Sequence, residues 1–87
     1  MTAGLARALG PAIRVNAIAP GFIESPWLRK GLGDDRYEAA RQDYMNTATL
    51  SAVISPEDVA EAAWWLGVGA RKTTGEVLLL DAGLRLA

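Results

Sequence analysis

The sequence predicts an α/β fold in which two short parallel strands belong to an open sheet. Two β-rich runs, residues 13–18 and 76–81, are separated by segments with helical signals. Residues 77–80 of the second run are uniformly apolar, which is typical of a parallel strand covered on both faces. Two strands alone cannot cover both faces and both edges. The pattern therefore predicts one portion of a larger sheet.

The composition allows one small domain and excludes several chemistries. The 87 residues are 51% hydrophobic and 22% charged, with a net charge of -1, no Cys and no His. These absences exclude disulfides, Cys-ligated zinc and a Ser-His-Asp triad. Scattered basic residues argue against nucleic-acid binding, and no apolar run reaches the ~20 residues of a membrane span. We expect a cytoplasmic protein with no metal, membrane or nucleic-acid partner.

The first half of the chain predicts one helix, one strand and an irregular segment. Residues 2–9 have helical spacing and end at Gly10-Pro11. Residues 13–18 predict a strand, followed by a turn at Pro20-Gly21. Breakers at Pro26, Gly31 and Gly33 make residues 22–33 either a loop or a broken helical piece.

The second half predicts two helices before the last strand. Asp34-Asp35 is expected to cap a helix that runs to about Ala48. The face of this helix is expected to contain Tyr37, Ala40, Tyr44 and Thr47. Ser55-Pro56-Glu57-Asp58 predicts an N-cap and an Asp variant of the capping box. The helix that follows is expected to end near Leu66, before Gly67 and Gly69, with Val59, Ala62, Ala63 and Leu66 on one face.

Several motifs have both a structural and a functional interpretation. Tyr37-x-x-x-Arg41 is favoured as a helix pair, because Arg does not release its proton. Gly31-Leu32-Gly33 is favoured as a flexible loop rather than a phosphate-binding turn. Adjacent tryptophans at Trp64-Trp65 are favoured in core and subunit-interface packing over a recognition patch. The acidic residues Glu24, Asp34, Asp35 and Asp43 are favoured as caps or solvated charges over a metal cluster.

Three ordered segments carry a resemblance to a known family. They are residues 14–25 (Arg-Val-Asn-Ala-Ile-Ala-Pro-Gly-Phe-Ile-Glu-Ser), 55–60 (Ser-Pro-Glu-Asp-Val-Ala) and 74–83 (Thr-Gly-Glu-Val-Leu-Leu-Leu-Asp-Ala-Gly). Together they closely resemble the C-terminal part of short-chain dehydrogenase/reductases, across essentially the whole chain. The resemblance implies that residues 1–87 are a partial NAD(P)-binding domain. Its fold would be a C-terminal fragment of a Rossmann-like doubly wound parallel sheet.

The resemblance also implies roles for individual residues. The cofactor-binding positions are Pro20, Gly21, Phe22, Ile23 and Ser25. Pro20 and Gly21 would shape the turn, the backbone of Ile23 would bond the nicotinamide carboxamide, and the Ser25 hydroxyl would contact the carboxamide or a phosphate. Capping of a turn is the alternative role for Ser25. Residues 26–51 match the substrate lid, with Trp27 and Leu28 at its start, and Asn16 matches a structural position.

The 87 residues contain no catalytic residue that the resemblance would supply. They hold neither the glycine-rich phosphate loop nor the Tyr-x-x-x-Lys pair, in which Lys lowers the pKa of Tyr for proton transfer. The chain would belong to an oxidoreductase that moves a hydride between NAD or NADP and an alcohol or carbonyl substrate. The isolated chain is expected to be inactive and weakly stable or self-associating.

The alternative function is a non-catalytic truncated remnant, at most an association module that acts through Trp65, Val77 and Leu79. In the complete protein, a homo-oligomer is expected through the 56–66 helix and the 76–81 strand.

Overall fold

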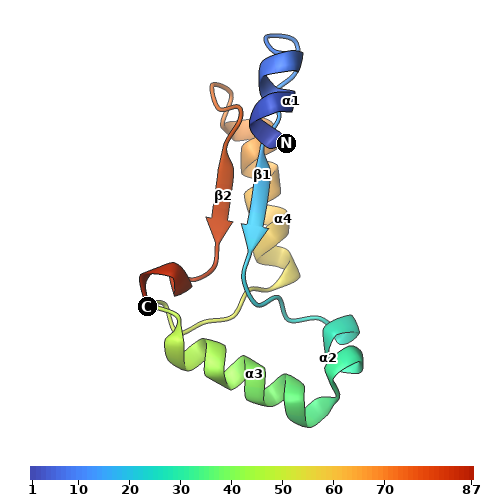
Figure 1. Cartoon of the computed structure of the whole chain (residues 1–87), viewed down its shortest axis with the longest axis vertical. Helices are drawn as coiled ribbons and strands as arrows, with labels where there is room; N and C mark the ends of the chain where they lie inside the picture. Colours follow the sequence, from blue (N-terminus) through green and yellow to red (C-terminus); the bar gives the residue numbers. More distant parts are fainter.

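Two parallel strands form the centre of the computed structural model, which describes all residues from Met1 to Ala87 (Figure 1). Strand β1 (Ala17–Pro20) pairs with β2 (Val77–Leu80), with Ala17 opposite Val77 and Pro20 opposite Leu80. The chain order is α1 (Thr2–Leu9), β1, α2 (Pro26–Leu32), α3 (Asp34–Thr47), α4 (Pro56–Trp64), a π turn (Trp65–Gly69), β2 and a 3-10 turn (Leu84–Leu86). The expected parallel α/β arrangement is confirmed.

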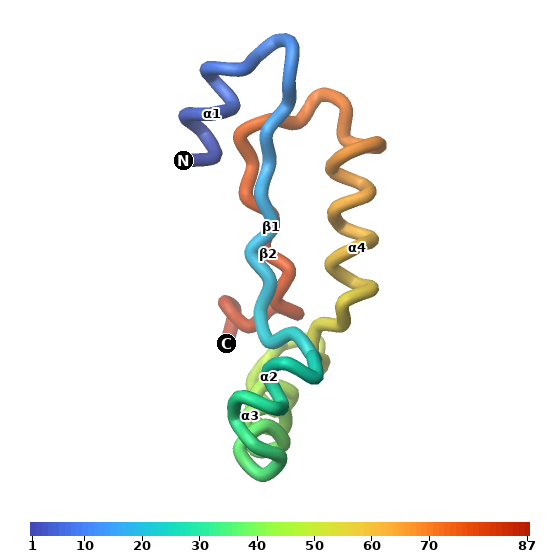
Figure 2. The backbone as a smooth tube through the Cα atoms, turned by 90° about the vertical axis from the view of Figure 1, so that its right-hand side faces the viewer, coloured from blue at the N-terminus to red at the C-terminus, as the bar shows by residue number.

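The helices cover the two faces of the sheet unequally. Figure 2 shows α4 running along one side of the strands, while α1 lies on the other side near their amino ends. Helices α2 and α3 lie beyond the carboxyl ends of the strands (Figure 1). The molecule is elongated, at 48 × 27 × 21 Å, and only 6 of its 87 residues are buried. None of the helices has the length and apolar character that crossing a membrane requires.

The first strand begins later than the sequence predicts. Residues 13–18 were expected to form it, but the strand covers Ala17–Pro20. A strand needs a partner for its backbone, and β2 begins only at Val77, so Ile13 lies beyond the end of the ladder and is 54% exposed. Asn16 bridges this end, since its Oδ1 accepts the N–H of Glu76 at 3.0 Å and its Nδ2 donates to the C=O of Thr73 at 3.0 Å. These bonds confirm its structural role.

The segment after β1 contains a helix rather than a continuous loop. Ser25 is the N-cap of α2, because its Oγ accepts the N–H of Leu28 at 3.0 Å, and Pro26 occupies the first turn. Gly33, with φ +84°, ends α2 and is also the N-cap of α3. Asp34 and Asp35 therefore lie in the first turn of α3, and the prediction that they cap it is wrong. A glycine reaches the left-handed region between the two helices at little cost.

The face of α3 follows the predicted spacing except at its end. Tyr37 is buried, Ala40 and Tyr44 are half-buried, and Thr47 is exposed. Thr47 was expected on the same face, and this prediction is wrong because α3 ends at this residue. The Thr47 hydroxyl donates instead to the C=O of Asp43, one turn earlier on the same helix. The helix thus contacts the rest of the chain through its two tyrosines.

The start of α4 matches the predicted capping box. The N–H of Asp58 donates to Ser55 Oγ at 3.1 Å, and the N–H of Ser55 donates to Asp58 Oδ2 at 2.8 Å. The pKa of the exposed Asp58 carboxyl is lowered, first by the bond from the Ser55 backbone N–H and then by the Ser55 hydroxyl. Both capping bonds fix the first turn of α4, so the entry of the chain into this helix is defined.

The predicted inner face of α4 is right at three positions and wrong at Ala63. Leu66 is buried and Val59 and Ala62 are half-buried, whereas Ala63 is exposed. Ala63 borders a hollow of about 820 Å³ between α4 and β1, which no other element of the chain fills. The missing cover lies on the side of β1 that faces away from β2.

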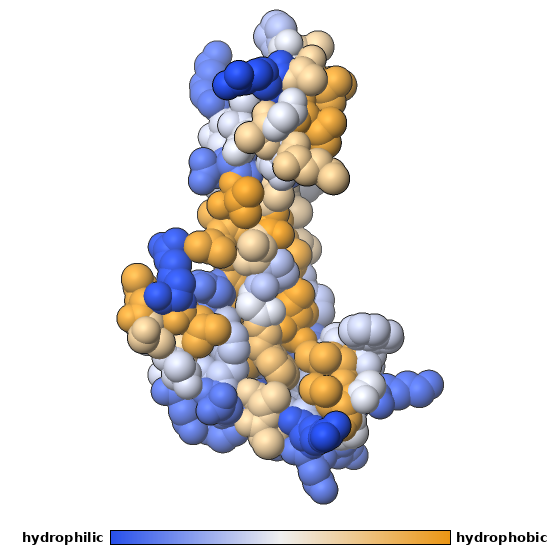
Figure 3. Space-filling model, in the orientation of Figure 1, coloured by the Kyte–Doolittle hydropathy of each residue, from blue (hydrophilic) through white to orange (hydrophobic).

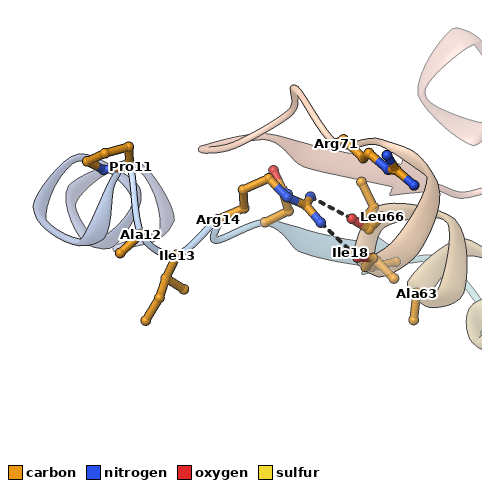
Figure 4. A pocket seen from close by; sticks show the side chains of 10 residues that line it. Pro11, Ala12, Ile13, Arg14, Ile18, Ala63, Leu66 and Arg71 are labelled. Carbon is orange, nitrogen blue, oxygen red and sulfur yellow. Dashed lines mark hydrogen bonds between the residues drawn. The ribbon is translucent and has the colours of Figure 1, made fainter.

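Arg14 crosses this hollow and holds the end of α4 (Figure 4). Its Nη1 donates to the carbonyls of Leu66 at 2.8 Å and Ala70 at 2.9 Å, and its Nη2 donates to Gly67 at 2.7 Å. A π turn leaves carbonyls without partners in the following turn. A cation there also suits the negative end of the helix dipole. The sequence offers no signal for this role, because Arg14 lies more than 50 residues from its partners.

Candidate functional site

The residues expected to contact a cofactor lie together at the carboxyl ends of both strands. The chain leaves β1 at Pro20, and Gly21 keeps one further bond to the sheet, from its N–H to the C=O of Leu80 at 2.9 Å. In open α/β sheets, ligands bind outside this edge. The loop 21–25 that follows has the location that the sequence predicts for it.

The backbone of Ile23 is free to bind a ligand. Ile23 and Ile54 form an isolated parallel bridge, in which the C=O of Phe22 accepts the N–H of Ile54 and the C=O of Ile54 accepts the N–H of Glu24, both at 2.8 Å. In a parallel bridge of this kind, the N–H and C=O of the central residue point to the opposite side. Neither group of Ile23 has a backbone partner. A planar amide that offers one donor and one acceptor fits such a pair.

Gly21 lies against the phenol end of the Tyr44 side chain. A Cβ at this position would overlap the Tyr44 hydroxyl and lie 2.8 Å from its Cζ and 3.2 Å from the Cα of Asp81. The resemblance assigns Gly21 to the shape of the turn after β1, which a glycine allows at little cost. The structure adds a second requirement, because an aromatic side chain of α3 occupies the space next to this backbone.

The hydroxyl of Tyr44 joins α3 to the end of β2. It donates to the C=O of Asp81 at 2.5 Å, and the two residues lie 37 positions apart. The ring of Phe22 packs at a tilt against those of Tyr37 and Tyr44, with centroids 5.5 and 5.9 Å away. We call Gly21, Phe22, Tyr44 and Asp81 the strand-end junction. It connects both strand ends with α3.

An ion pair provides a second link between the loop and α3. Arg41 Nε donates to Glu24 Oε1 at 2.8 Å, and both side chains are between a quarter and a half exposed. The bond to Glu24 raises the pKa of the Arg41 guanidinium, which is charged at any ordinary pH. Exposed pairs contribute about 0–1 kcal/mol. The pair therefore adds orientation more than stability.

The remaining predicted site residues, Ser25, Trp27 and Leu28, lie at the start of α2. The Ser25 hydroxyl caps the helix through its lone pair, which supports the capping role, and its proton stays free to donate to a ligand. Trp27 is 81% exposed and Leu28 is half-buried. The expected lid, residues 26–51, comprises α2, α3 and the start of the return to α4, and it lies beyond the strand ends (Figure 1).

The turn after β2 is tightly bonded but contains a strained residue. Asp81 Oδ1 accepts the N–H of Gly83 at 3.0 Å, its Oδ2 accepts the N–H of Arg85 at 3.2 Å, and Thr49 Oγ1 donates to the C=O of Gly83 at 2.9 Å. Ala82 between them has φ +54°. A residue with a Cβ is uncommon in this region. The turn therefore combines several hydrogen bonds with backbone strain at Ala82.

The motifs with alternative interpretations have different outcomes: the expected flexible loop at Gly31-Leu32-Gly33 is wrong, because these residues form the end of α2 and its C-cap. Tyr37 is 3% exposed and packs between Phe22 and the guanidinium of Arg29, whose Cζ lies 4.6 Å from the ring centroid. The structure holds no group of three or more acidic side chains that could bind a metal ion. Trp64 and Trp65 are 72% and 52% exposed, so this chain provides neither with a core position.

Sequence reasoning missed the junction partner of the loop. It identified Tyr44 only as a member of a helix face, and Asp81 only as a turn residue. Nothing in the spacing could pair an α3 hydroxyl with a carbonyl 37 residues later. The one available signal was a glycine directly after Pro20 at a strand end. A glycine there indicates that another group lies close to the backbone, but it does not show which group.

The family comparison matches nearly the whole chain. Residues 1–85 match the sequence model of the family described as enoyl-(acyl carrier protein) reductase. The chain belongs to the short-chain dehydrogenase/reductase family. Its similarity to the protein named ketoacyl reductase 2 of the granaticin polyketide synthase of Streptomyces violaceoruber is 46% identity over 82 residues. The 3-oxoacyl-[acyl-carrier-protein] reductase FabG of Thermotoga maritima is 38% identical over 76 residues.

Solved structures of short-chain dehydrogenases have the same fold. A small-chain dehydrogenase in complex with NADPH superposes with a TM-score of 0.86 at 32% identity, over 99% of this chain and 38% of that one. The MalC reductase/Diels-Alderase of Malbranchea aurantiaca gives 0.83 at 37% identity, over 97% of this chain and 33% of that one. The fold is therefore a portion of the Rossmann-type α/β fold of this family.

The matches span only part of each relative. They cover 94% of this chain but 31% of the Streptomyces protein, and 86% of this chain but 29% of the Thermotoga protein. The chain thus spans about a third of the length of these relatives. This ratio agrees with a sheet of only two strands, both of whose outer edges are unpaired.

Proposed function

We propose that residues 1–87 form the nicotinamide side of an NAD(P)-dependent oxidoreductase domain. The loop Pro20–Ser25 would contact the cofactor, with Ile23 bonding the carboxamide through its backbone. The free N–H and C=O of Ile23 at the carboxyl edge of the sheet carry this proposal. When bound, the nicotinamide accepts or delivers the hydride. This chain's residues bind and orient that ring.

Residues 26–51 would cover the substrate. The exposed Trp27 and the half-buried Leu28 give the start of this segment an apolar surface next to the loop. An alcohol or carbonyl compound is the substrate class, since those are the partners of nicotinamide in hydride exchange. The names of the relatives mention ketoacyl and 3-oxoacyl reductases. We therefore place a carbonyl that is reduced to an alcohol first among substrates.

A composite domain tests this proposal. Residues 1–87 replace the matching segment of the Streptomyces ketoacyl reductase, and a second composite uses the Thermotoga reductase. A 3-oxoacyl thioester and NADH or NADPH are supplied, and consumption of the reduced cofactor is followed by absorbance. We expect turnover with at least one cofactor. Folded composites without turnover would contradict the proposal.

The role of Ile23 is tested in the same composite. Ile23→Pro removes the N–H without adding a charge, whereas Ile23→Val keeps the backbone groups and serves as the control. Loss of one hydrogen bond raises the KM for the cofactor by about tenfold. An unchanged KM in a folded Ile23→Pro variant would place the carboxamide elsewhere.

Subunit contacts would form on the surfaces that the chain leaves apolar. Figure 3 shows hydrophobic side chains along the middle of the molecule, where the strands lie. Val77 and Leu79 are 50% and 45% exposed on β2, and Trp64 and Trp65 are exposed at the end of α4. We propose that these surfaces join copies of the complete domain. Leu79→Lys in the composite should lower its sedimentation coefficient to that of a monomer.

The second candidate function is a non-catalytic association module. The exposed apolar residues on β2 and α4 favour it, because large apolar patches mark interaction surfaces. Turnover by the composite domain distinguishes the two candidates, since an association module gives none. The isolated 87-residue chain is tested separately in a titration with NADH and NADPH, followed by tryptophan fluorescence. The oxidoreductase proposal expects no micromolar binding without the phosphate-binding segment, together with self-association in sedimentation. A cooperative monomer would contradict that expectation.

A further inference from the structure

We propose that Tyr44 is a positioning residue that sets the cofactor loop through Gly21. The inference deepens the proposed function and rests on it. Tyr44 belongs to α3 in the proposed lid, yet its hydroxyl donates to the C=O of Asp81 at the end of β2. The phenol end of its side chain lies against Gly21, the first residue of the loop 21–25.

The geometry gives Gly21 contacts on two sides. On one side its N–H donates to the C=O of Leu80 at 2.9 Å, which continues the parallel ladder beyond β1. On the other side the hydroxyl and Cζ of Tyr44 fill the space that a side chain would occupy. The backbone of Gly21 therefore has one position between the end of β2 and this ring.

The contact continues into the residues that the proposal assigns to the nicotinamide. Phe22 packs against Tyr44 with a centroid distance of 5.9 Å, and its C=O accepts the N–H of Ile54. Ile23 follows with its unpaired backbone groups. A shift of the Tyr44 ring would move Gly21 and Phe22 first and then change the direction of the Ile23 groups. The hydroxyl bond to Asp81 prevents that shift.

A neighbouring hydroxyl provides a matched control. Thr49 Oγ1 donates to the C=O of Gly83 at 2.9 Å, so it also joins the segment after α3 to the turn after β2. Thr49 contacts Gly83 and not Gly21. Tyr44→Phe and Thr49→Val each remove one hydroxyl bond to this turn and keep the shape of the side chain. Only the first also releases the ring over the loop.

The kinetic test uses both variants in the composite domain. We expect Tyr44→Phe to raise the KM for NADH or NADPH about fivefold, with kcat changed less than about twofold, because lost ground-state positioning acts on binding. Thr49→Val should leave this KM unchanged, while both variants lower the midpoint of thermal unfolding. Equal KM values in the two variants would overturn the inference. A composite without nicotinamide-dependent turnover would count against the proposed function instead.

Amide hydrogen exchange gives a second readout that needs no turnover. In Tyr44→Phe the amide of Gly21, which is bonded to Leu80, should exchange faster than in the unsubstituted composite. The same amide should be unaffected by Thr49→Val. Equal exchange rates at Gly21 in the two variants would also overturn the inference.

Discussion

At the carboxyl ends of the strands, side chains of this chain hold each neighbouring segment, whereas β1 on its other side borders a hollow of about 820 Å³. The strand-end junction places Gly21 between β2 and Tyr44 and connects it to α3. Beside the hollow, Ala63 and Ile13 are exposed, and only Arg14 spans the space. This chain alone therefore forms the strand-end junction, whereas the region beside the hollow needs further elements to cover it.

The largest effect should come from adding one methyl group at the junction. Gly21→Ala places a Cβ into the ring of Tyr44 and beside the backbone of Asp81. Overpacking against atoms that cannot move away should lower the free energy of unfolding of the composite domain by about 3 kcal/mol. Denaturant unfolding measures the loss.

Two further variants establish the cause of that loss. Gly31→Ala in α2 has no atom within 4 Å of its new Cβ, so it should keep or slightly increase stability. In a protein that already carries Tyr44→Ala, adding Gly21→Ala should lower the free energy of unfolding by much less than about 3 kcal/mol. A full loss in that background would mean that Tyr44 is not the obstacle.

The second effect is on the open side, at Arg14. Arg14→Met keeps an unbranched side chain but removes the donor of the Leu66 and Gly67 carbonyls and leaves the Ala70 carbonyl with the N–H of Thr73 alone. We expect the composite to lose about 2 kcal/mol, the cost of unpaired polar groups in a partly buried position. Arg71→Met is the control, since Arg71 borders the same hollow and is exposed. Equal losses in denaturant unfolding would show that charge near the hollow matters more than the carbonyl bonds.

A smaller effect, a gain in stability, is expected in the turn after β2. Ala82 has φ +54°, a conformation that costs residues with a Cβ roughly 1–2 kcal/mol. Ala82→Gly removes this strain but adds chain entropy to the unfolded state, so a net gain of about 0.5 kcal/mol is expected. Thermal unfolding of the composite measures it. Ala60→Gly, within α4, should instead destabilise by about 1 kcal/mol.

The smallest effect concerns pH and the start of α4. Bonds from Ser55 lower the pKa of the exposed Asp58 carboxyl in the folded state. A depressed folded pKa means that the contribution is present above the unfolded Asp pKa of about 3.9 and is lost as pH falls through the folded value. Asp58→Asn should therefore flatten the acid limb of a stability profile measured by denaturant unfolding. An identical acid limb in both proteins would contradict this assignment.

The sequence predicted the elements whose determinants are local. The capping box at Ser55 and Asp58 lies within four residues, and the apolar run 77–80 indicates a strand, so both elements were identified correctly. The expected cover on both faces of this strand is wrong for this chain, because Val77 and Leu79 are 50% and 45% exposed. The bounds of β1 were wrong because they depend on where β2 begins, some 60 residues later. The face of α4 was wrong at Ala63 because helical spacing cannot show which side of a sheet lacks a neighbour.

The candidate site shows the same division between local and distant determinants. Ser25 was given a capping role from its place before Pro26, and the structure supports it. The link of Tyr44 to Asp81 and Gly21 depends on three segments that meet only in the folded chain. Arg14 is comparable, because its partners are the carbonyls of a π turn that no residue pattern announced.

Pro20 limits how far another strand can extend along the outer edge of β1. The N–H groups of Ala17 and Gly21 donate to β2, so by alternation those of Ile18 and residue 20 point to the outer edge. Residue 20 is proline and has no amide hydrogen. A strand that pairs with this edge therefore finds its last donor at Ile18. The end of β1 beside the loop 21–25 therefore offers no donor to a neighbouring strand at residue 20.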